Sequence, residues 1–180
     1  EREHELPREF EDLVVAEARQ APADQDLERA HQRDLRQEHD DLRDDEWFRQ
    51  PSGGVTHIAW QVGHLAMAQY RLLLDRIRGE QSSDTVLISP QFLLQFGKGS
   101  QPNDQPSAYP VIVEIRATFD RVYQQALTEL PRLSDTQLDE APVKGHPLFN
   151  TKYGSLCWCA RHEMLHAGQI GLVRRLIGRE

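Results

Sequence analysis

Two histidines stand four residues apart near the end of the sequence, at His162 and His166. In a helix their side chains would lie on one face, on successive turns, within reach of a single metal ion. Glu163 stands beside His162, and we take this segment to lack the glutamate pattern that marks a zincin protease. Two histidines at this spacing can also be ordinary core residues, each hydrogen-bonded to a carbonyl group. A metal site therefore needs a third ligand from elsewhere in the chain.

The segment around these histidines has the period of an α-helix, which we expect between Gly154 and Arg179. Alternating steps of three and four residues place one set of side chains on a common seam: Cys159, His162, His166, Gln169, Val173 and Leu176. Apolar residues flank this seam: Trp158, Leu165, Ile170 and Leu172. The seam, with its two histidines, is therefore expected to face the interior of the protein.

A second apolar stretch, THIAWQVGHLAMAQYRLLL, contains His57 and His64. It predicts a helix from a capping Thr56 to Arg78, ended by Gly79. The helix is apolar on more than one side, which is typical of a helix buried between neighbours in a bundle. This pattern allows His64 to lie inside but does not require it. His57 could support the site or face a substrate, although we favour a surface histidine at the helix start.

These residues carry a resemblance to a known family. HxxxHAGQI followed by LVRRLIG, with the upstream WQVGHLA, resembles the DinB-like superfamily of four-helix metal-binding proteins. The wider group includes bacterial thiol-dependent transferases and mycothiol-dependent maleylpyruvate isomerases. The resemblance extends from about Leu27 to Gly178. In that family, one histidine of the GHLA-type segment and both histidines of HxxxH bind a divalent metal. The resemblance thus implies His64, His162 and His166 as ligands, with zinc or nickel as the expected ion.

The patterns and the resemblance together predict an all-α fold. We expect a DinB-like four-helix bundle with up-down-down-up order, in one domain that spans residues 1–180. The bundle helices are expected at about Gln25–Trp47, Thr56–Arg78, Ala108–Leu130 and Gly154–Arg179. An additional helix, Pro7–Arg19, precedes them, and residues 79–108 form a long connection between the second and third bundle helices.

The third bundle helix is expected to be scaffold, with Pro110 in its first turn. Its core stripe consists of Val111, Ile112, Ile115, Phe119, Val122, Ala126 and Leu127. In the preceding connection we expect a short helix at Pro90–Phe96. Phe92 or Phe96 could line the mouth of a metal pocket, or could plug the core. After the third helix, Ser134 is expected to cap a short turn.

Three residues near the histidines leave alternatives open. Cys159 could be a fourth ligand that closes the site, although a small buried core residue is the interpretation we favour. Glu163 could act as a base or accept a hydrogen bond from a ligand. For Glu163 we favour an ion pair with an arginine, at the surface or between helices. Gln169 is expected to form a hydrogen bond across helices.

The composition narrows the function further. The 180 residues suffice for a buried core, and the net charge is −8, with the acidic excess concentrated in residues 1–50. This charge excludes nucleic-acid binding through a basic surface, and no apolar run is long enough to cross a membrane. No leader segment opens the sequence. Cys157 and Cys159 point apart on a helix and cannot form an ordinary disulfide, which favours the cytoplasm.

Three neutral imidazoles leave a divalent ion with an open position, as in catalytic sites. The ion could hold a thiol as a thiolate for transfer to a small electrophile, or activate a water molecule for hydrolysis. The resemblance favours a thiol S-transferase, with an electrophile and a low-molecular-weight thiol as partners. A metal-dependent hydrolase and a non-catalytic metal-binding stress-response protein are the alternatives. A homodimer is implied by the resemblance alone.

Overall fold

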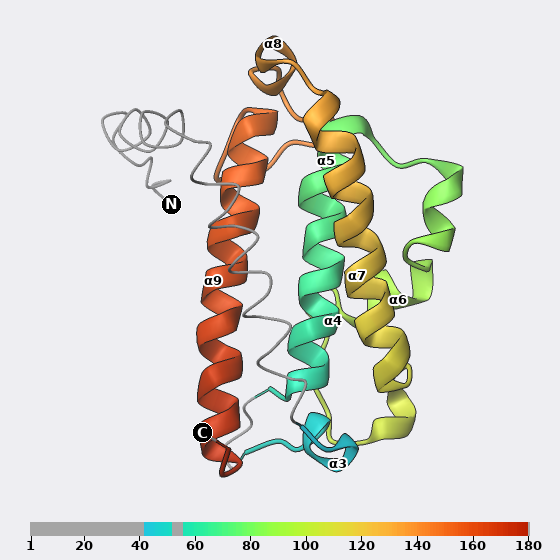
Figure 1. The fold of residues 1–180 in the computed structure, drawn as a ribbon, viewed down its shortest axis with the longest axis vertical. Coiled ribbons are helices and arrows are strands. Elements are labelled where there is room, and N and C mark those ends of the chain that lie inside the picture. The colour runs from blue at the N-terminus through green and yellow to red at the C-terminus, as the bar shows by residue number, and fades with distance from the viewer. Residues whose placement is uncertain (1–41, 52–55, 180) are drawn as a thin grey trace. The chain divides into compact units, whose positions relative to one another are not determined.

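The computed structural model describes residues 42–51 and 56–179, and the regular elements in these ranges are all helices (Figure 1). The α-helices are α3 Asp44–Trp47, α4 Ile58–Gln69, α5 Arg76–Arg78, α6 Pro90–Gln95, α7 Ile112–Glu129, α8 Asp135–Leu138 and α9 Lys152–Leu176. The other helices are the π-helix η1 Tyr70–Asp75 and the short 3-10 helices η2 Ser82–Val86, η3 Pro106–Ala108 and η4 Leu130–Arg132. The predicted all-α fold is confirmed.

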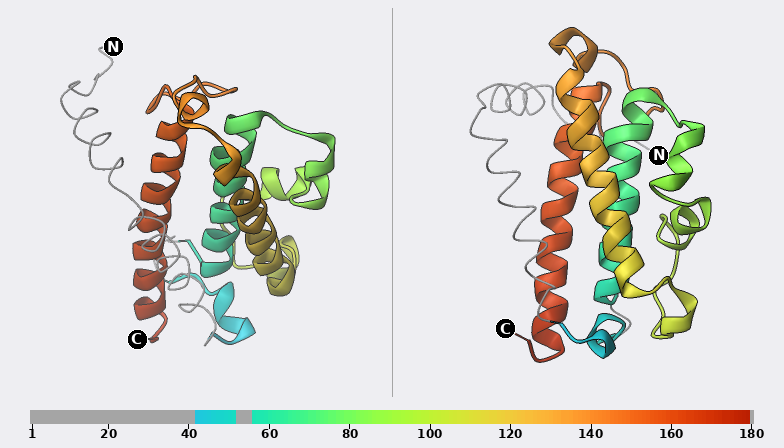
Figure 2. Two further views of the ribbon diagram at one scale, coloured as in Figure 1. Left: turned by 45° about the horizontal axis from the view of Figure 1, so that its top comes forward. Right: turned by 45° about the vertical axis from the view of Figure 1, so that its right-hand side comes forward.

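The long helices have the predicted order of directions. The rod formed by α4, η1 and α5 runs parallel to α7, whereas α9 runs the opposite way (Figure 1 and Figure 2). The predicted helices Pro7–Arg19 and Gln25–Trp47 lie outside the described residues, except that α3 falls at the end of the second. The single domain over residues 1–180 therefore stays a prediction. No helix in the described part of the chain is both long and apolar enough to cross a membrane.

The helix that begins with α4 is buried on both sides, as its pattern predicts. It packs between α7 and α9, and Gly79 ends it with a φ of 84° (Figure 1). The second half of this helix contains the π-helix η1, which the apolar pattern of the sequence does not predict. There the hydroxyl of Ser155, on α9, donates a hydrogen bond of 2.8 Å to the backbone carbonyl of Leu72. This bond ties α9 to the widened turn.

The residue that caps α4 is His57, not Thr56. Its Nδ1 accepts a hydrogen bond of 3.1 Å from the backbone N–H of Trp60, as an N-cap side chain does. The imidazole is fully buried, and its centroid lies 5.5 Å from the ring of Phe48 and 5.0 Å from that of Tyr109. The prediction of a surface histidine was therefore wrong, because capping and aromatic packing draw this side chain inward.

The connection between α5 and α7 contains the short helix that the sequence predicts. Ser89 caps α6 by accepting a hydrogen bond of 3.1 Å from the N–H of Phe92. Phe92 and Phe96 are both buried in the core, with ring centroids 4.4 Å apart. The interpretation of these rings as a plug over the core is thus supported.

A buried polar network fastens the start of this connection to the helices. The carboxylate of Asp84 accepts hydrogen bonds from the hydroxyl of Tyr70 at 3.0 Å and from Arg78 at 2.8 and 3.0 Å. Arg78 also donates to Glu129 on α7 at 2.6 Å. Burial by itself would raise the pKa of Asp84, but the hydrogen bonds from Arg78, the N–H of Gln81 and Tyr70 bring this pKa below its ordinary value.

Helix α7 is the scaffold that the sequence predicts, with a later start. Pro110 precedes the helix rather than lying in its first turn, and the cap is Val111. Residues before a proline favour extended backbone, and Tyr109 is extended at φ −123° and ψ 162°. Most of the predicted stripe is buried, but Val111 and Leu127 are exposed and were wrongly assigned to the core. Ser134 caps α8 as predicted.

Helix α9 begins after a capping Thr151 and buries less of its surface than its pattern suggests. Cys159, His166, Ile170 and Val173 are buried. The predicted inward position of Leu176 on the seam was wrong, because its exposed fraction is 53%, and the flanking Leu165 and Leu172 are 60% and 46% exposed. Among the described elements, α9 packs mainly on α4, η1 and α5, and these leucines lie off that contact face.

The first prediction concerns the Asp84 network. Replacing Asp84 by alanine should lower the free energy of unfolding by about 3 kcal/mol or more, because Arg78 would stay buried without its main partner. The matched control is Asp45→Ala, which breaks the Asp45–Arg43 pair, whose side chains are 73% and 66% exposed. That change should cost less than about 1 kcal/mol. Urea unfolding followed by circular dichroism measures both, and equal losses would contradict the prediction.

The second prediction concerns His57 and pH. Burial lowers the pKa of His57 to about 4 from its ordinary 6.5, so protonation favours the unfolded chain. The stability that this neutral imidazole contributes is complete above pH 6.5 and is lost as pH falls toward 4. His57→Asn keeps a capping oxygen without a titrating group. Its stability should fall less steeply over this range, by up to about 3 kcal/mol. The other histidines titrate in both proteins, so parallel curves would refute the prediction.

Candidate metal centre

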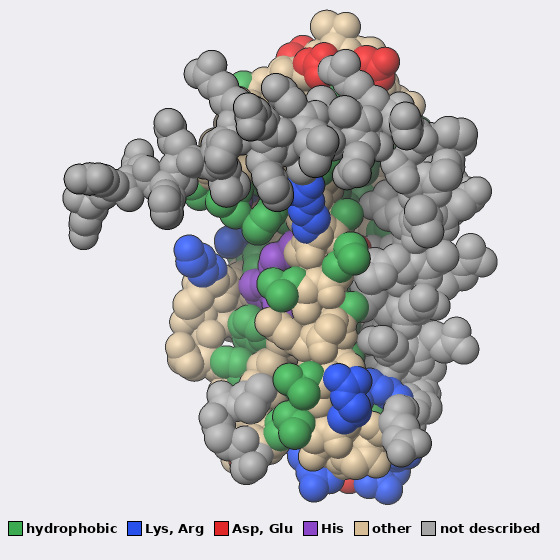
Figure 3. Space-filling model, turned by 90° about the vertical axis from the view of Figure 1, so that its left-hand side faces the viewer, with side chains coloured by type: hydrophobic (Ala, Val, Ile, Leu, Met, Phe, Trp, Pro, Cys, Tyr) green, Lys and Arg blue, Asp and Glu red, His purple; other side chains and the backbone are tan. Residues whose placement is uncertain are grey.

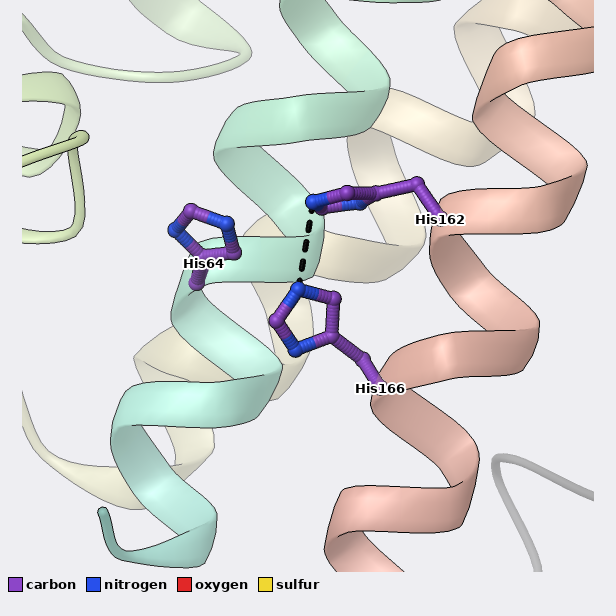
Figure 4. A group of neighbouring side chains, drawn as sticks. All are labelled: His64, His162 and His166. Carbon is purple, nitrogen blue, oxygen red and sulfur yellow. Dashed lines mark hydrogen bonds between the residues drawn. The ribbon is translucent and has the colours of Figure 1, made fainter. Parts of the chain in front are cut away.

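Three histidines from two helices come together between α4 and α9. His64 lies on α4, and His162 and His166 lie on successive turns of α9 (Figure 4). Each can offer one ring nitrogen such that all three nitrogens lie within 4.8 Å of one another. The ring centroids are 5.3 Å apart for His64 and His162, 4.9 Å for His64 and His166, and 4.4 Å for His162 and His166. The sequence-predicted ligands are thus brought into one cluster.

Hydrogen bonds fix the tautomers of two of these rings. The Nδ1 of His64 lies 2.8 Å from the backbone carbonyl oxygen of Phe96, and the Nδ1 of His166 contacts the amide oxygen Oε1 of Gln61. An oxygen of either kind only accepts, so both Nδ1 atoms carry the proton and donate. The Nε2 atoms of His64 and His166 therefore keep their lone pairs for a ligand, the arrangement usual in metal-binding histidines.

The contact between the two α9 histidines fits a shared cation. Their Nε2 atoms lie 3.1 Å apart (Figure 4). Two lone pairs at this distance repel unless a proton or a cation lies between them. Two imidazoles on one zinc ion, each with a Zn–N bond of about 2.0 Å, have nitrogens about 3.3 Å apart in tetrahedral geometry. Within the described residues, the buried Nδ1 of His162 has no hydrogen-bond partner.

Burial keeps all three rings neutral, as metal ligands must be. Loss of solvent is the largest cause of the shifts, and it lowers the pKa of His162 to about 4 and that of His166 to about 3. The neighbouring histidines of the cluster lower both values further. Burial also lowers the pKa of His64, and the hydrogen bond to the Phe96 carbonyl opposes this shift.

The connection after α6 forms one wall of the site. The indole of Trp60 stacks on His64, with centroids 4.7 Å apart and planes at 13°. Its Nε1 donates a hydrogen bond of 2.9 Å to the hydroxyl of Ser100 in that connection. In Figure 3, histidine side chains reach the surface in the middle of one face, bordered by hydrophobic side chains. Histidine and hydrophobic side chains thus lie together on this face.

Cys159 and Glu163 do not belong to the cluster of possible ligands that the described residues form. Cys159 is buried and donates to Oε1 of Glu163 at 3.4 Å, in keeping with a core residue. Glu163 is also buried, and the same oxygen accepts a hydrogen bond of 2.9 Å from Gln69 on α4. Of the two placements expected for Glu163, the surface one is excluded by its burial, and its carboxylate bonds across the helix interface to the amide of Gln69.

The spacing itself also needs a correction. Residues 162–166 read His-Glu-Met-Leu-His, which does match the H-E-x-x-H pattern of zincins. In that pattern the glutamate serves as a general base beside the metal. Here the Oε1 atom of Glu163 is occupied by the donors Gln69 and Cys159. Glu163 therefore matches the zincin spacing but does not have the arrangement of a zincin general base.

Two glutamines complete the site. The predicted bond of Gln169 across helices is confirmed, because its Oε1 accepts a hydrogen bond of 3.0 Å from Nε2 of Gln61. Gln61 itself is absent from the sequence-based site, although it bonds to His166. A signal was present, since this amide stands on an apolar helix one turn before His64, where a buried polar group must find a partner.

The third prediction concerns Gly63, beside His64. A Cβ atom at this position would overlap the fully buried ring of Phe96, whose carbonyl holds His64. Gly63→Ala should therefore lower the free energy of unfolding by about 1–3 kcal/mol, despite the better helix propensity of alanine. The control is Gly168→Ala on α9, where a Cβ meets no atom of the described residues within 4 Å and should stabilise by about 0.5–1 kcal/mol. Thermal unfolding of both variants tests this, and a stabilised Gly63→Ala protein would disprove it.

Comparison with known proteins agrees with the geometry. No curated protein matches the chain. The family model of the DinB superfamily matches residues 27–170, a stretch that contains α4, α7, all three clustered histidines and both glutamines. The chain therefore belongs to the DinB superfamily.

Proposed function

We propose that this protein is a metal-dependent enzyme that transfers a low-molecular-weight thiol to a small electrophile. His64, His162 and His166 would hold a divalent ion, zinc or nickel. The single observation that carries the proposal is the convergence of three neutral imidazoles, two of them held by Nδ1 hydrogen bonds that leave Nε2 free. Such a three-histidine set leaves coordination positions open, as catalytic sites do and closed structural sites do not.

When bound, the ion would supply a positive charge that stabilises a thiol cosubstrate as thiolate. The chain's own residues prepare the place for this chemistry. Gln61 and the carbonyl of Phe96 orient two of the ligands. Trp60 covers one face of His64 and limits the access of water from that side. The hydrophobic side chains beside the histidines on the face in Figure 3 would favour a small electrophile with a hydrophobic part.

The contacts of Glu163 favour transfer over the hydrolytic alternative. A hydrolase on these ligands would need a base to accept a proton from the attacking water. Glu163 is the acidic residue that the zincin spacing would nominate, yet its Oε1 accepts hydrogen bonds from Gln69 and Cys159. A thiol that is already ionised needs no such base.

The fourth prediction tests this function through metal content and thiol consumption. Untagged protein should contain about one equivalent of a divalent ion, and His64→Ala and His162→Ala should each lose it, since each removes a ligand. The control His146→Ala changes a histidine that stacks on Phe149, outside the cluster, and should keep the metal. Loss of free thiol in the presence of small electrophiles should require the metal and disappear in the same two variants.

Three results would redirect the proposal. Metal-dependent cleavage of esters or amides without thiol loss would indicate the hydrolase. A bound metal with neither activity would indicate a non-catalytic metal-binding protein. Absence of metal after reconstitution with zinc and with nickel would mean that the histidines are core groups.

A further inference from the structure

We propose that Gln61 is a positioning residue that fixes the tautomer of His166, and that Gln169 in turn orients the amide of Gln61. This inference rests on the proposed function, because a fixed tautomer matters only if Nε2 of His166 is to meet a cation. Neither glutamine would touch the reacting atoms. Their role is to keep His166 in the tautomer and orientation in which its Nε2 can bind a cation.

The geometry forms a chain of hydrogen bonds that runs from α9 to α4 and back. Gln61 is 1% exposed and lies one turn before His64. Its Oε1 accepts from Nδ1 of His166, and its Nε2 donates to Oε1 of Gln169 at 3.0 Å. Both ends of this one buried amide are thus engaged by residues of α9, three positions apart.

The pair resists reversal. An amide oxygen only accepts and an amide nitrogen only donates. If Gln61 alone turned over, its nitrogen would face His166 and its oxygen would face Oε1 of Gln169, two acceptors in contact. Reversal therefore requires both amides to turn together, and that of Gln61 is buried in the close-packed interior. As long as they do not, His166 stays protonated on Nδ1 and presents the Nε2 lone pair to His162.

The other histidines show why this side chain is needed. In His64 the proton is held on Nδ1 by the backbone carbonyl of Phe96, a group that can only accept. No described backbone carbonyl accepts a hydrogen bond from Nδ1 of His166. The side-chain oxygen of Gln61 accepts it instead.

A second buried amide on the same rod provides the matched control. Gln69 is fully buried like Gln61 and also donates across to α9, but its partner is Glu163 rather than a histidine. Replacing either glutamine by methionine removes one buried amide from an unbranched side chain of similar length. Loss of stability should accompany both changes. Only the change at Gln61 should affect His166.

The fifth prediction is tested first in metal-free protein, by long-range proton–nitrogen NMR of ¹⁵N-labelled histidine. In the wild type, His166 should be protonated on Nδ1. Gln61→Met should shift it toward the Nε2-protonated form, and Gln169→Met, at a half-buried position, should do so more weakly. Gln61→Glu should restore the wild-type tautomer, since a carboxylate only accepts. Gln69→Met should leave the tautomer unchanged.

Zinc affinity, measured by chelator competition, gives the second readout. Gln61→Met should bind zinc about 10–100-fold more weakly, Gln61→Glu should recover the affinity, and Gln69→Met should match the wild type. The inference is overturned if Gln61→Met and Gln169→Met both leave the tautomer unchanged, or if Gln69→Met weakens zinc binding equally. If the wild type binds no metal, the proposed function fails, yet the tautomer measurement still decides the role of Gln61.

Discussion

The burial of α4 on both sides is the constraint from which the site follows. A helix packed between two neighbours has no solvent to satisfy its polar side chains, so each must find a partner across an interface. His64 meets the carbonyl of Phe96, Gln61 meets His166 and Gln169, and Gln69 meets Glu163. The polar residues of one apolar helix thus determine which residues of α9 and of the connection lie beside them.

The long connection is part of the site because it is fastened at two points. Near its start, Asp84 is held by Tyr70 and Arg78 at the end of the α4 rod. Past its middle, the ring of Phe96 lies against Gly63 and its carbonyl bonds to His64. A segment held at both places cannot drift from the histidines, so a loop of irregular backbone can orient a ligand as firmly as a helix does.

Periodicity in the sequence was sufficient to predict which face of α9 turns inward, but not how deep each residue would lie. The steps between Cys159, His162 and His166 placed these residues on one side of α9, and the family resemblance supplied His64. The same pattern wrongly placed Leu176 inside, because apolar character does not show where the neighbouring helix ends. For Glu163 the pattern left the surface and the helix interface open, since a charged residue is normally exposed. Its burial depends on an amide of α4, a partner that only the fold reveals.

The molecule contains its own comparison between a structural histidine and a ligand histidine. His57 and His64 stand on one helix, and both are buried or half-buried with a lowered pKa. In His57 the lone pair of Nδ1 accepts a hydrogen bond from the N–H of Trp60, so this nitrogen cannot bind a cation. His64 donates from Nδ1 to an oxygen, which leaves the lone pair of Nε2 directed elsewhere. The direction of the Nδ1 hydrogen bond, rather than burial or pKa, therefore separates the two roles. By this criterion His166 groups with His64, and the amide of Gln61 is what places it there.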